Sequence, residues 1–228
     1  MVFIWCLTVF MLLSCSTADD QVPEDPEYSE AFLKLLYVFN GNFSDHRLVD
    51  AYKSIDDPDL YVPKLGYLTI MPVEVTALAP AVTYLLEEYW ENSLIRRQFC
   101  ILWEEENNQI YLQTFNITSP PNDMSKPFTL GQVKKLTFDD LVTRDDCKVT
   151  FTRKGTNTFT AIWPDCKAQY DGVLPHYIAT FSCNSMVVVA NNPDSVDYLA
   201  VPVSATREGP RFPFPTYLKK VEENVTCP

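Results

Sequence analysis

The sequence predicts a mainly β fold, in which an antiparallel sheet closes into a barrel after a short N-terminal helical segment. Three observations predict it. Roughly eight to ten runs rich in β-branched and aromatic residues follow one another, separated by short clusters of turn-forming residues. A helical pattern precedes them, and no internal repeat or second domain is visible. Many short strands with brief connections are typical of antiparallel barrels.

The first residues have the features of a secretory signal peptide. Residues 1–18 contain an apolar run without a charged side chain, and small residues precede Asp19. Residues 12–15, Leu-Leu-Ser-Cys, can also be read as a bacterial lipoprotein box. The signal-peptide interpretation predicts a secreted, extracellular protein with no membrane span in its mature part, which begins with an acidic, disordered lead over residues 19–28.

Composition and motifs exclude several functions. A net charge of −12 argues against nucleic acid and anionic membranes as partners. The two histidines, His46 and His176, are not spaced as metal ligands, so we expect no metal site. Neither a nucleophile-elbow sequence nor a glycine-rich phosphate loop is present. A conventional hydrolase, kinase or nucleotide-dependent enzyme is therefore disfavoured.

The domain is predicted to span residues 29–220, with a C-terminal tail over residues 221–228, and to open with a helix. Ser29 is suited to cap its N-terminus, and Gly41 is a stop signal. A second helical segment is predicted over residues 45–53, before a break at residues 56–59. The apolar residues at helical spacing in the first helix are Phe32, Leu35, Leu36 and Phe39.

Strands are predicted from β-branched and aromatic residues between turn clusters. Residues 81–90 could form a helix by composition, but the neighbouring runs favour a strand. Prolines at 202, 213 and 215 indicate edge or bulged strands near the end of the chain. The predicted strands are 66–71, 81–90, 94–103, 109–117, 148–153, 158–163, 177–183, 186–190, 198–203 and 212–218.

The segment 136–166 contains a short acidic helical turn and a predicted hairpin flanked by two cysteines. Residues 154–157 form the turn, so Cys147 and Cys166 lie at the open ends of the two strands and are expected to form a disulfide. There are two alternatives: one of these cysteines could pair with Cys183 or Cys227 instead, or one could be a reactive thiol. Three sequons agree with a secreted glycoprotein; their asparagines are Asn42, Asn116 and Asn224.

The strongest cluster of candidate binding residues lies in the predicted hairpin of residues 81–103. Glu88 and Arg96 could bind a ligand with acidic and polar edges, while Tyr84 and Trp90 offer flat apolar surface. Alternate side chains of such a hairpin face inward. The alternative is a cross-strand salt bridge with the aromatic residues in the core.

The chain resembles the CpcT/CpeT family of phycobiliprotein chromophore lyases. The resemblance covers residues 36–218, and its most specific part is the helical turn, cysteine, hairpin and second cysteine of residues 136–166. The other segments that carry it are 41–44 (GNFS), 57–61 (DPDLY), 86–90 (LEEYW), 95–96 (IR) and 110–112 (IYL).

This resemblance implies a calycin-type, lipocalin-like barrel, often dimeric, with a cavity for a linear tetrapyrrole (bilin). The family promotes thioether formation between the bilin and a cysteine of an acceptor protein, without a required cofactor. Carried over to this chain, Glu87 or Glu88 would be the acid that protonates the bilin, and Arg96 would clamp a propionate. Tyr84, Glu87, Tyr89, Trp90 and Tyr111 are the predicted ligand-binding residues.

Three functions remain open from the sequence. The first is a lyase that attaches a bilin to an acceptor cysteine. The second is a secreted, non-catalytic carrier of a bilin or another flat hydrophobic ligand. The third is an interaction protein whose barrel is filled by its own side chains. The aromatic content and the Glu88–Arg96 pair favour the second over the third, and the family resemblance ranks the first at the top.

Overall fold

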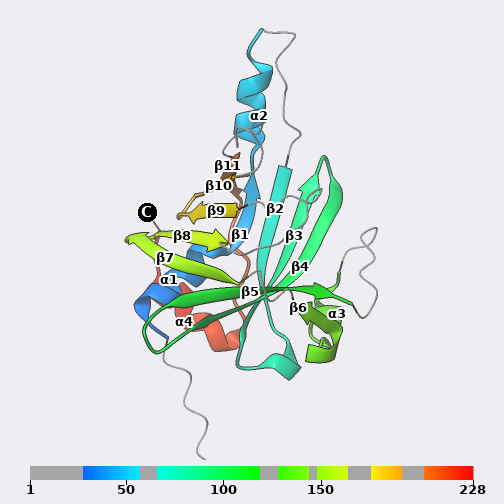
Figure 1. The fold of residues 1–228 in the computed structure, drawn as a ribbon, viewed down its shortest axis with the longest axis vertical. Coiled ribbons are helices and arrows are strands. Elements are labelled where there is room, and N and C mark those ends of the chain that lie inside the picture. The colour runs from blue at the N-terminus through cyan, green and yellow to red at the C-terminus, as the bar shows by residue number, and fades with distance from the viewer. Residues whose placement is uncertain are drawn as a thin grey trace, which may run out of the picture.

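The computed structural model describes residues 28–56, 66–118, 128–143, 148–163, 176–191 and 203–227. These ranges form a closed antiparallel barrel with a few short helices (Figure 1), which confirms the predicted fold class. The strand order is β4-β3-β2-β1-β11-β10-β9-β8-β7-β5-β6, and a further β4–β5 pairing closes the ring, so that β6 lies outside it. The predicted signal peptide and acidic lead fall outside the described residues, except for Tyr28.

The strands and helices are short and follow one another closely. The helices are α1 (Glu30–Phe39), α2 (His46–Lys53), α3 (Leu130–Val133) and α4 (Lys219–Asn224). The strands are β1 (Gly41–Ser44), β2 (Gly66–Val73), β3 (Val82–Trp90), β4 (Ser93–Glu104), β5 (Ile110–Ile117), β6 (Leu141–Thr143), β7 (Val149–Gly155), β8 (Thr158–Trp163), β9 (His176–Phe181), β10 (Ser185–Asn191) and β11 (Val203–Glu208).

The two ends of the barrel differ. Because every pairing is antiparallel, the turns β2–β3, β4–β5, β7–β8 and β9–β10 share one end with α1 and α4, which we call the lower end. The opposite, upper end carries α2 and the β3–β4 turn (Figure 1). Four longer connections, 45–65, 118–148, 164–175 and 192–202, also join strands at the upper end, and each runs partly or wholly outside the described residues.

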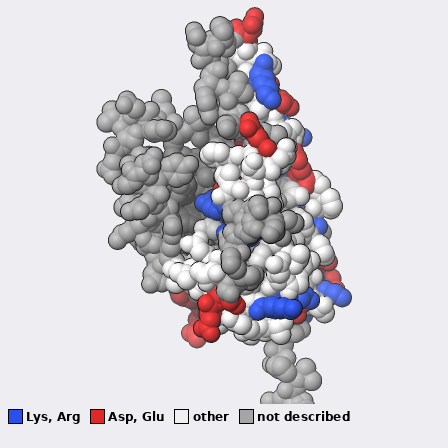
Figure 2. All heavy atoms as spheres, turned by 90° about the vertical axis from the view of Figure 1, so that its right-hand side faces the viewer, with Lys and Arg blue, Asp and Glu red and all other residues white. Residues whose placement is uncertain are grey.

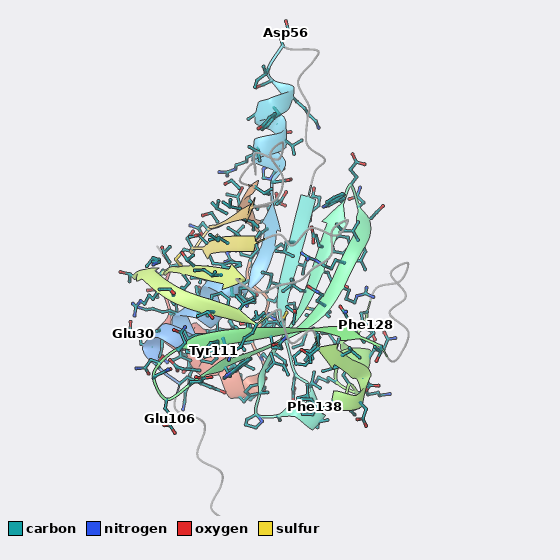
Figure 3. All side chains as sticks on the ribbon, in the orientation of Figure 1. Glu30, Asp56, Glu106, Tyr111, Phe128 and Phe138 are labelled. Atoms are coloured by element: carbon teal, nitrogen blue, oxygen red, sulfur yellow. A yellow bond between two sulfur atoms is a disulfide. The ribbon has the colours of Figure 1, made fainter. Side chains whose placement is uncertain are left out.

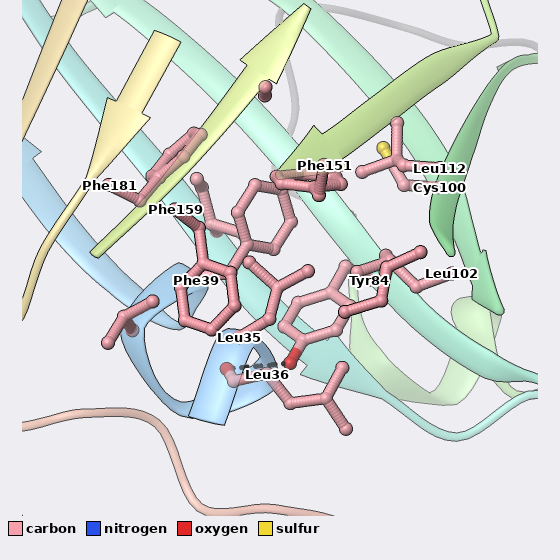
Figure 4. Close-up of a cluster of buried hydrophobic side chains, with 14 of the residues drawn as sticks. Leu35, Leu36, Phe39, Tyr84, Cys100, Leu102, Leu112, Phe151, Phe159 and Phe181 are labelled. Carbon is pink, nitrogen blue, oxygen red and sulfur yellow. Dashed lines mark hydrogen bonds between the residues drawn. The ribbon is translucent and has the colours of Figure 1, made fainter. Parts of the chain in front are cut away.

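Helix α1 closes the lower end of the barrel. Its apolar face enters the interior, where Phe32, Leu35, Leu36 and Phe39 are at most 3% exposed. These residues pack against aromatic side chains from the strands around them (Figure 4). The helix begins as predicted, since Ser29 Oγ accepts a hydrogen bond from the Phe32 amide.

Replacing Ser29 by alanine is expected to lower the free energy of unfolding by about 1–2 kcal/mol. The change removes the cap and also the hydrogen bond from Ser29 Oγ to Glu104 Oε1, which is 2.5 Å long. Ser54→Ala is the matched control, because the Ser54 hydroxyl only contacts the exposed end of α2. Urea unfolding followed by circular dichroism measures both variants. Equal midpoints for the two variants would contradict the capping role.

Two arginines fix the C-terminal end of α1 to the barrel. Arg207 donates to the carbonyl oxygens of Val38, at 2.7 Å, and Cys183, at 2.9 Å, and also to that of Asn40. Arg211 donates to the Tyr37 carbonyl oxygen, and its guanidinium lies 3.9 Å over the Tyr37 ring. Burial lowers the pKa of Arg207 to about 10, so the group stays charged at neutral pH. These contacts satisfy carbonyls that the end of a helix leaves unpaired.

A second apolar core lies on the outer side of the barrel. The segment of residues 128–141, which includes α3, packs there against β3 and β4. Leu85 and Phe99 face outward and are at most 1% exposed, because Val133 and Leu136 cover them. Two clusters, one inside the barrel and one outside, therefore bury the inner face and part of the outer face of β2 to β5.

The structure differs from the sequence predictions near both ends of the chain. Residues 212–218 were predicted as a strand, but they are irregular and end in a 3-10 turn. Of the strand predicted at 198–203 only Val203 lies within the described ranges, where it begins β11. Gly41 begins β1, a strand that was not predicted. The predicted tail contains part of α4, in which Val221 is fully buried.

Candidate functional site

The predicted pair Glu88 and Arg96 faces the interior of the barrel near its upper end. Phe43, Leu68, Glu88 and Arg96 lie opposite one another across β1, β2, β3 and β4. Residues in such a row share one face of the sheet, and Phe43 belongs to the inner core. Arg96 Nη2 lies 2.6 Å from Glu88 Oε2. The Glu88 side chain is 26% exposed and that of Arg96 51%, so solvent reaches the pair.

The neighbouring pair, Glu87 and Arg97, faces the outside of the barrel. Arg97 Nε donates to Glu87 Oε1 at 2.6 Å, and the Arg97 side chain is only 1% exposed. The Arg97 guanidinium lies 5.3 Å from the ring centre of Phe128. Tyr89 donates its hydroxyl to Glu87 Oε2, and burial together with this bond raises the pKa of Tyr89 to about 12. The structure thus separates Glu87 and Tyr89 from Glu88.

Tyr84 forms part of the floor beneath the Glu88–Arg96 pair. Its side chain is fully buried, and its hydroxyl donates to the Leu36 carbonyl oxygen at 3.0 Å (Figure 4). Burial raises the pKa of Tyr84 well above 10. Its ring meets that of Phe39 edge to face. Tyr84 therefore supports the floor through both its ring and its hydroxyl.

The two remaining aromatic residues of the predicted site lie elsewhere. Tyr111 is on the outer face of β5, toward the lower end (Figure 3), where it stacks on Trp103 and lies under the Lys148 ammonium. Trp90 ends β3 and is 42% exposed at the upper rim. Of the predicted residues, Glu88, Arg96 and Trp90 thus belong to the inner or rim side of the upper half, and Tyr84 lies below them next to α1.

Sequence reasoning missed several neighbours of the pair on the inner face. Gln98 on β4 and Thr114 on β5 follow the same alternation and are partly buried polar residues. On the strands across the ring, the inner core contains Ala161, Ala179 and Ala205 together with the larger Phe159, Phe181 and Met186. The alternation of β4 could have identified Gln98. A polar wall that faces apolar side chains suits an amphiphilic ligand.

The cysteines within the described ranges, Cys100, Cys183 and Cys227, do not provide a nucleophile in this region. Cys100 faces the inner core, and burial raises the pKa of its thiol to about 12. Cys183 and Cys227 form a disulfide, which is compatible with an oxidising compartment. That bond excludes the alternative pairing of Cys147 or Cys166 with either residue. The predicted Cys147–Cys166 bridge lies outside the described residues.

The described residues were also compared with the requirements of a metal site and of a membrane-spanning helix. They contain no group of three or more His, Cys, Asp and Glu side chains that could hold a metal ion. Within the same ranges no helix is long and apolar enough to cross a membrane. Acidic and basic side chains are interspersed over the visible part of the face that Figure 2 shows.

Comparison with known proteins does not assign the chain to a family: no protein-family model matches it, and no curated protein matches it at a significant level.

Proposed function

We propose that this chain is a secreted, chromophore lyase-like protein that binds a linear tetrapyrrole at the upper inner face of its barrel and presents it to a cysteine of an acceptor protein. The observation that carries the proposal is the inward-facing Glu88–Arg96 pair above an apolar, aromatic floor. A linear tetrapyrrole has matching parts, namely a flat conjugated body, pyrrole N–H groups and two propionates.

Each side of the pair has a role in this proposal. Arg96 is half exposed and has N–H donors beyond the one that Glu88 uses, so it can hold a propionate through two parallel hydrogen bonds. Glu88 can accept hydrogen bonds from pyrrole N–H groups or deliver a proton to the bilin. The floor around Tyr84 and the apolar residues on the opposite wall would contact the conjugated rings.

Covalent attachment would use a thiol of the acceptor protein. In that step the acceptor sulfur adds to a vinyl-derived carbon of the bilin, forming a C–S bond, while the thiol proton ends on the adjacent carbon. The addition needs no oxidant or reductant. Cys100 is a poor competitor for the bilin, since burial raises its pKa to about 12. The lyase would contribute orientation, exclusion of water and an acid.

A non-catalytic carrier is the second candidate. Glu88 is already engaged by Arg96 at 2.6 Å, so in this arrangement it is placed to accept hydrogen bonds rather than to donate a proton. Non-covalent binding needs only that arrangement, whereas transfer needs Glu88 to be released. The two functions differ in whether the bilin becomes linked to the acceptor.

Replacing Arg96 by alanine is expected to weaken bilin binding by about 10- to 100-fold. A hydrogen bond to a charged group contributes roughly 1.5–3 kcal/mol, and 1.4 kcal/mol corresponds to a factor of ten. Titration with biliverdin or phycocyanobilin, followed by the red-shifted absorption band of the bound pigment, gives the dissociation constant. Arg153→Ala is the matched control, because it removes the same charge near the turn at the lower end. We expect no change in that variant.

Three outcomes separate the functions. Pigment that remains on an acceptor protein after denaturation, seen by zinc-induced fluorescence, supports the lyase, and Glu88→Ala should then abolish the transfer. Binding without transfer supports the carrier. The absence of any spectral change would refute both and would leave an interaction protein whose barrel is filled by its own side chains.

A further inference from the structure

A groove on the outer face of the barrel lies directly beside the first predicted glycosylation site. It has a volume of about 420 Å³, which falls within the range of small-molecule sites. Strands β1, β2, β3 and β11 and the β3–β4 turn contribute to it. Its lining residues are Asn42, Tyr67, Thr69, Tyr89, Asn92 and Glu208.

The floor of the groove orients the Asn42 side chain. Asn42 lies opposite Thr69 on one neighbouring strand and Glu208 on the other. Thr69 Oγ1 donates to Asn42 Oδ1 at 2.8 Å, which fixes the amide plane. Among the described residues, no acceptor is bound to Asn42 Nδ2. This nitrogen is the atom that carries the sugar in an N-glycoprotein, so the groove lies where the first sugar would be attached.

The walls of the groove are also held in place by contacts behind them. Tyr67 and Tyr89 lie opposite each other on β2 and β3 and are partly exposed. Tyr89 is fixed through its hydroxyl, which donates to Glu87. On the other side, Glu208 Oε1 lies 2.5 Å from His46 Nδ1. Two of the lining side chains, Tyr89 and Glu208, thus have partners within the protein that restrict them before any ligand binds, which reduces the entropic cost of binding.

The chemistry of these walls matches that of an N-acetylhexosamine. The C–H face of a pyranose ring and its acetyl methyl group are apolar, and tyrosine rings offer flat apolar surface beside a polar hydroxyl. The hydroxyl groups and the acetamide of the sugar need donors and acceptors, which Asn92, Thr69 and Glu208 provide.

We infer that this groove binds the first N-acetylglucosamine of a glycan attached to Asn42, and that the seated sugar stabilises the four strands beneath it. The other two sequons have different surroundings. Asn224 Nδ2 already donates to the Lys220 carbonyl oxygen, and Asn116 is exposed on β5, away from this groove. The inference depends on secretion but not on bilin binding, so the two can fail separately.

The test compares one sequence in three glycan states. The N116Q/N224Q chain is made in eukaryotic cells that produce high-mannose glycans, and part of it is trimmed with endoglycosidase H to a single N-acetylglucosamine. The same chain from a bacterial periplasm supplies the unglycosylated state with Asn42 intact. We expect the intact and trimmed forms to melt at the same temperature, about 2–4 °C above the unglycosylated form.

A substitution then identifies the groove as the cause. Tyr67→Ala should abolish the difference between the trimmed and unglycosylated forms. Tyr111→Ala is the matched control, because Tyr111 also lies on the outer face but stacks on Trp103 instead, and this variant should retain the difference. Three results would overturn the inference: no sugar on Asn42 by mass spectrometry, equal melting of the trimmed and unglycosylated forms, or equal behaviour of the two tyrosine variants.

Discussion

Replacing Phe39 by alanine is expected to lower the free energy of unfolding by about 3–5 kcal/mol, as for other large aromatic residues removed from a core. Phe39 is 3% exposed at the end of α1. Its ring lies 5.3 Å from that of Tyr84, 5.9 Å from that of Phe151 and 5.0 Å from that of Phe181. These partners belong to three different strands, β3, β7 and β9, whose pairing in the barrel limits how far they can collapse into the space left behind.

Phe138→Ala is the matched control, since Phe138 is 63% exposed beside β6 (Figure 3). We expect that variant to change the stability by less than about 0.5 kcal/mol. Urea unfolding monitored by circular dichroism gives both values. A loss for Phe39→Ala as small as that of the control would mean that α1 does not close the barrel in solution.

The sequence predicted the strands that have a regular local pattern. The strands β2 to β5 and the β7–β8 hairpin were predicted close to their observed bounds, because β-branched and aromatic residues alternate there between clear turns. Helix α1 was equally predictable, because the sequence shows both its N-cap and the helical spacing of its apolar residues. Strand β1 was missed because it has only four residues and follows the helix directly. A glycine in that position indicates a helix end just as well.

The end of the chain could not be predicted from local pattern, because distant contacts determine its conformation. Residues 212–218 contain apolar and aromatic residues that favour a strand by composition. Instead, the Phe212 amide donates to Asn40 Oδ1 and the Asn40 side chain donates to the Phe212 carbonyl oxygen. This pair uses the backbone groups that a sheet would need. It joins residues that the sequence separates by 172 positions.

The candidate site was predictable as a set of residues but not as an arrangement. Composition indicated that carboxylates and guanidiniums share one hairpin, and alternation indicated that only half of them face inward. Which half does so depends on the register with β1, where Phe43 faces the inner core. That register places Glu88 inside and Glu87 outside. The groove beside Asn42 was even harder to predict from the sequence, since its residues come from strands far apart in the chain.

Replacing both Cys183 and Cys227 by serine is expected to lower the free energy of unfolding by about 4 kcal/mol. The bond closes a loop with a sequence separation of 44, and the entropy that such a cross-link removes from the unfolded chain corresponds to roughly that value. The carbonyl oxygen of Cys183, which accepts hydrogen bonds from Arg207 and Arg211, is a backbone group and remains in the variant. The variant therefore removes the cross-link and, beside it, only the contact of 3.5 Å that Arg211 Nη2 makes with Cys227 Sγ among the hydrogen bonds described for these two side chains.

Urea unfolding of the secreted protein under oxidising conditions measures this loss while leaving any other disulfide intact. Cys100→Ser is the control for replacing a buried cysteine that forms no bridge. Mass spectrometry after alkylation should find the Cys183–Cys227 peptide in the parent chain only. Because the bond holds the C-terminal segment, which contains the buried Val221 and Val225, its loss should also increase hydrogen exchange in α4 before the strands open. Equal hydrogen exchange of α4 in the parent chain and the variant, with no loss of stability, would show that the packing of α4 and the arginine contacts hold this segment without the disulfide.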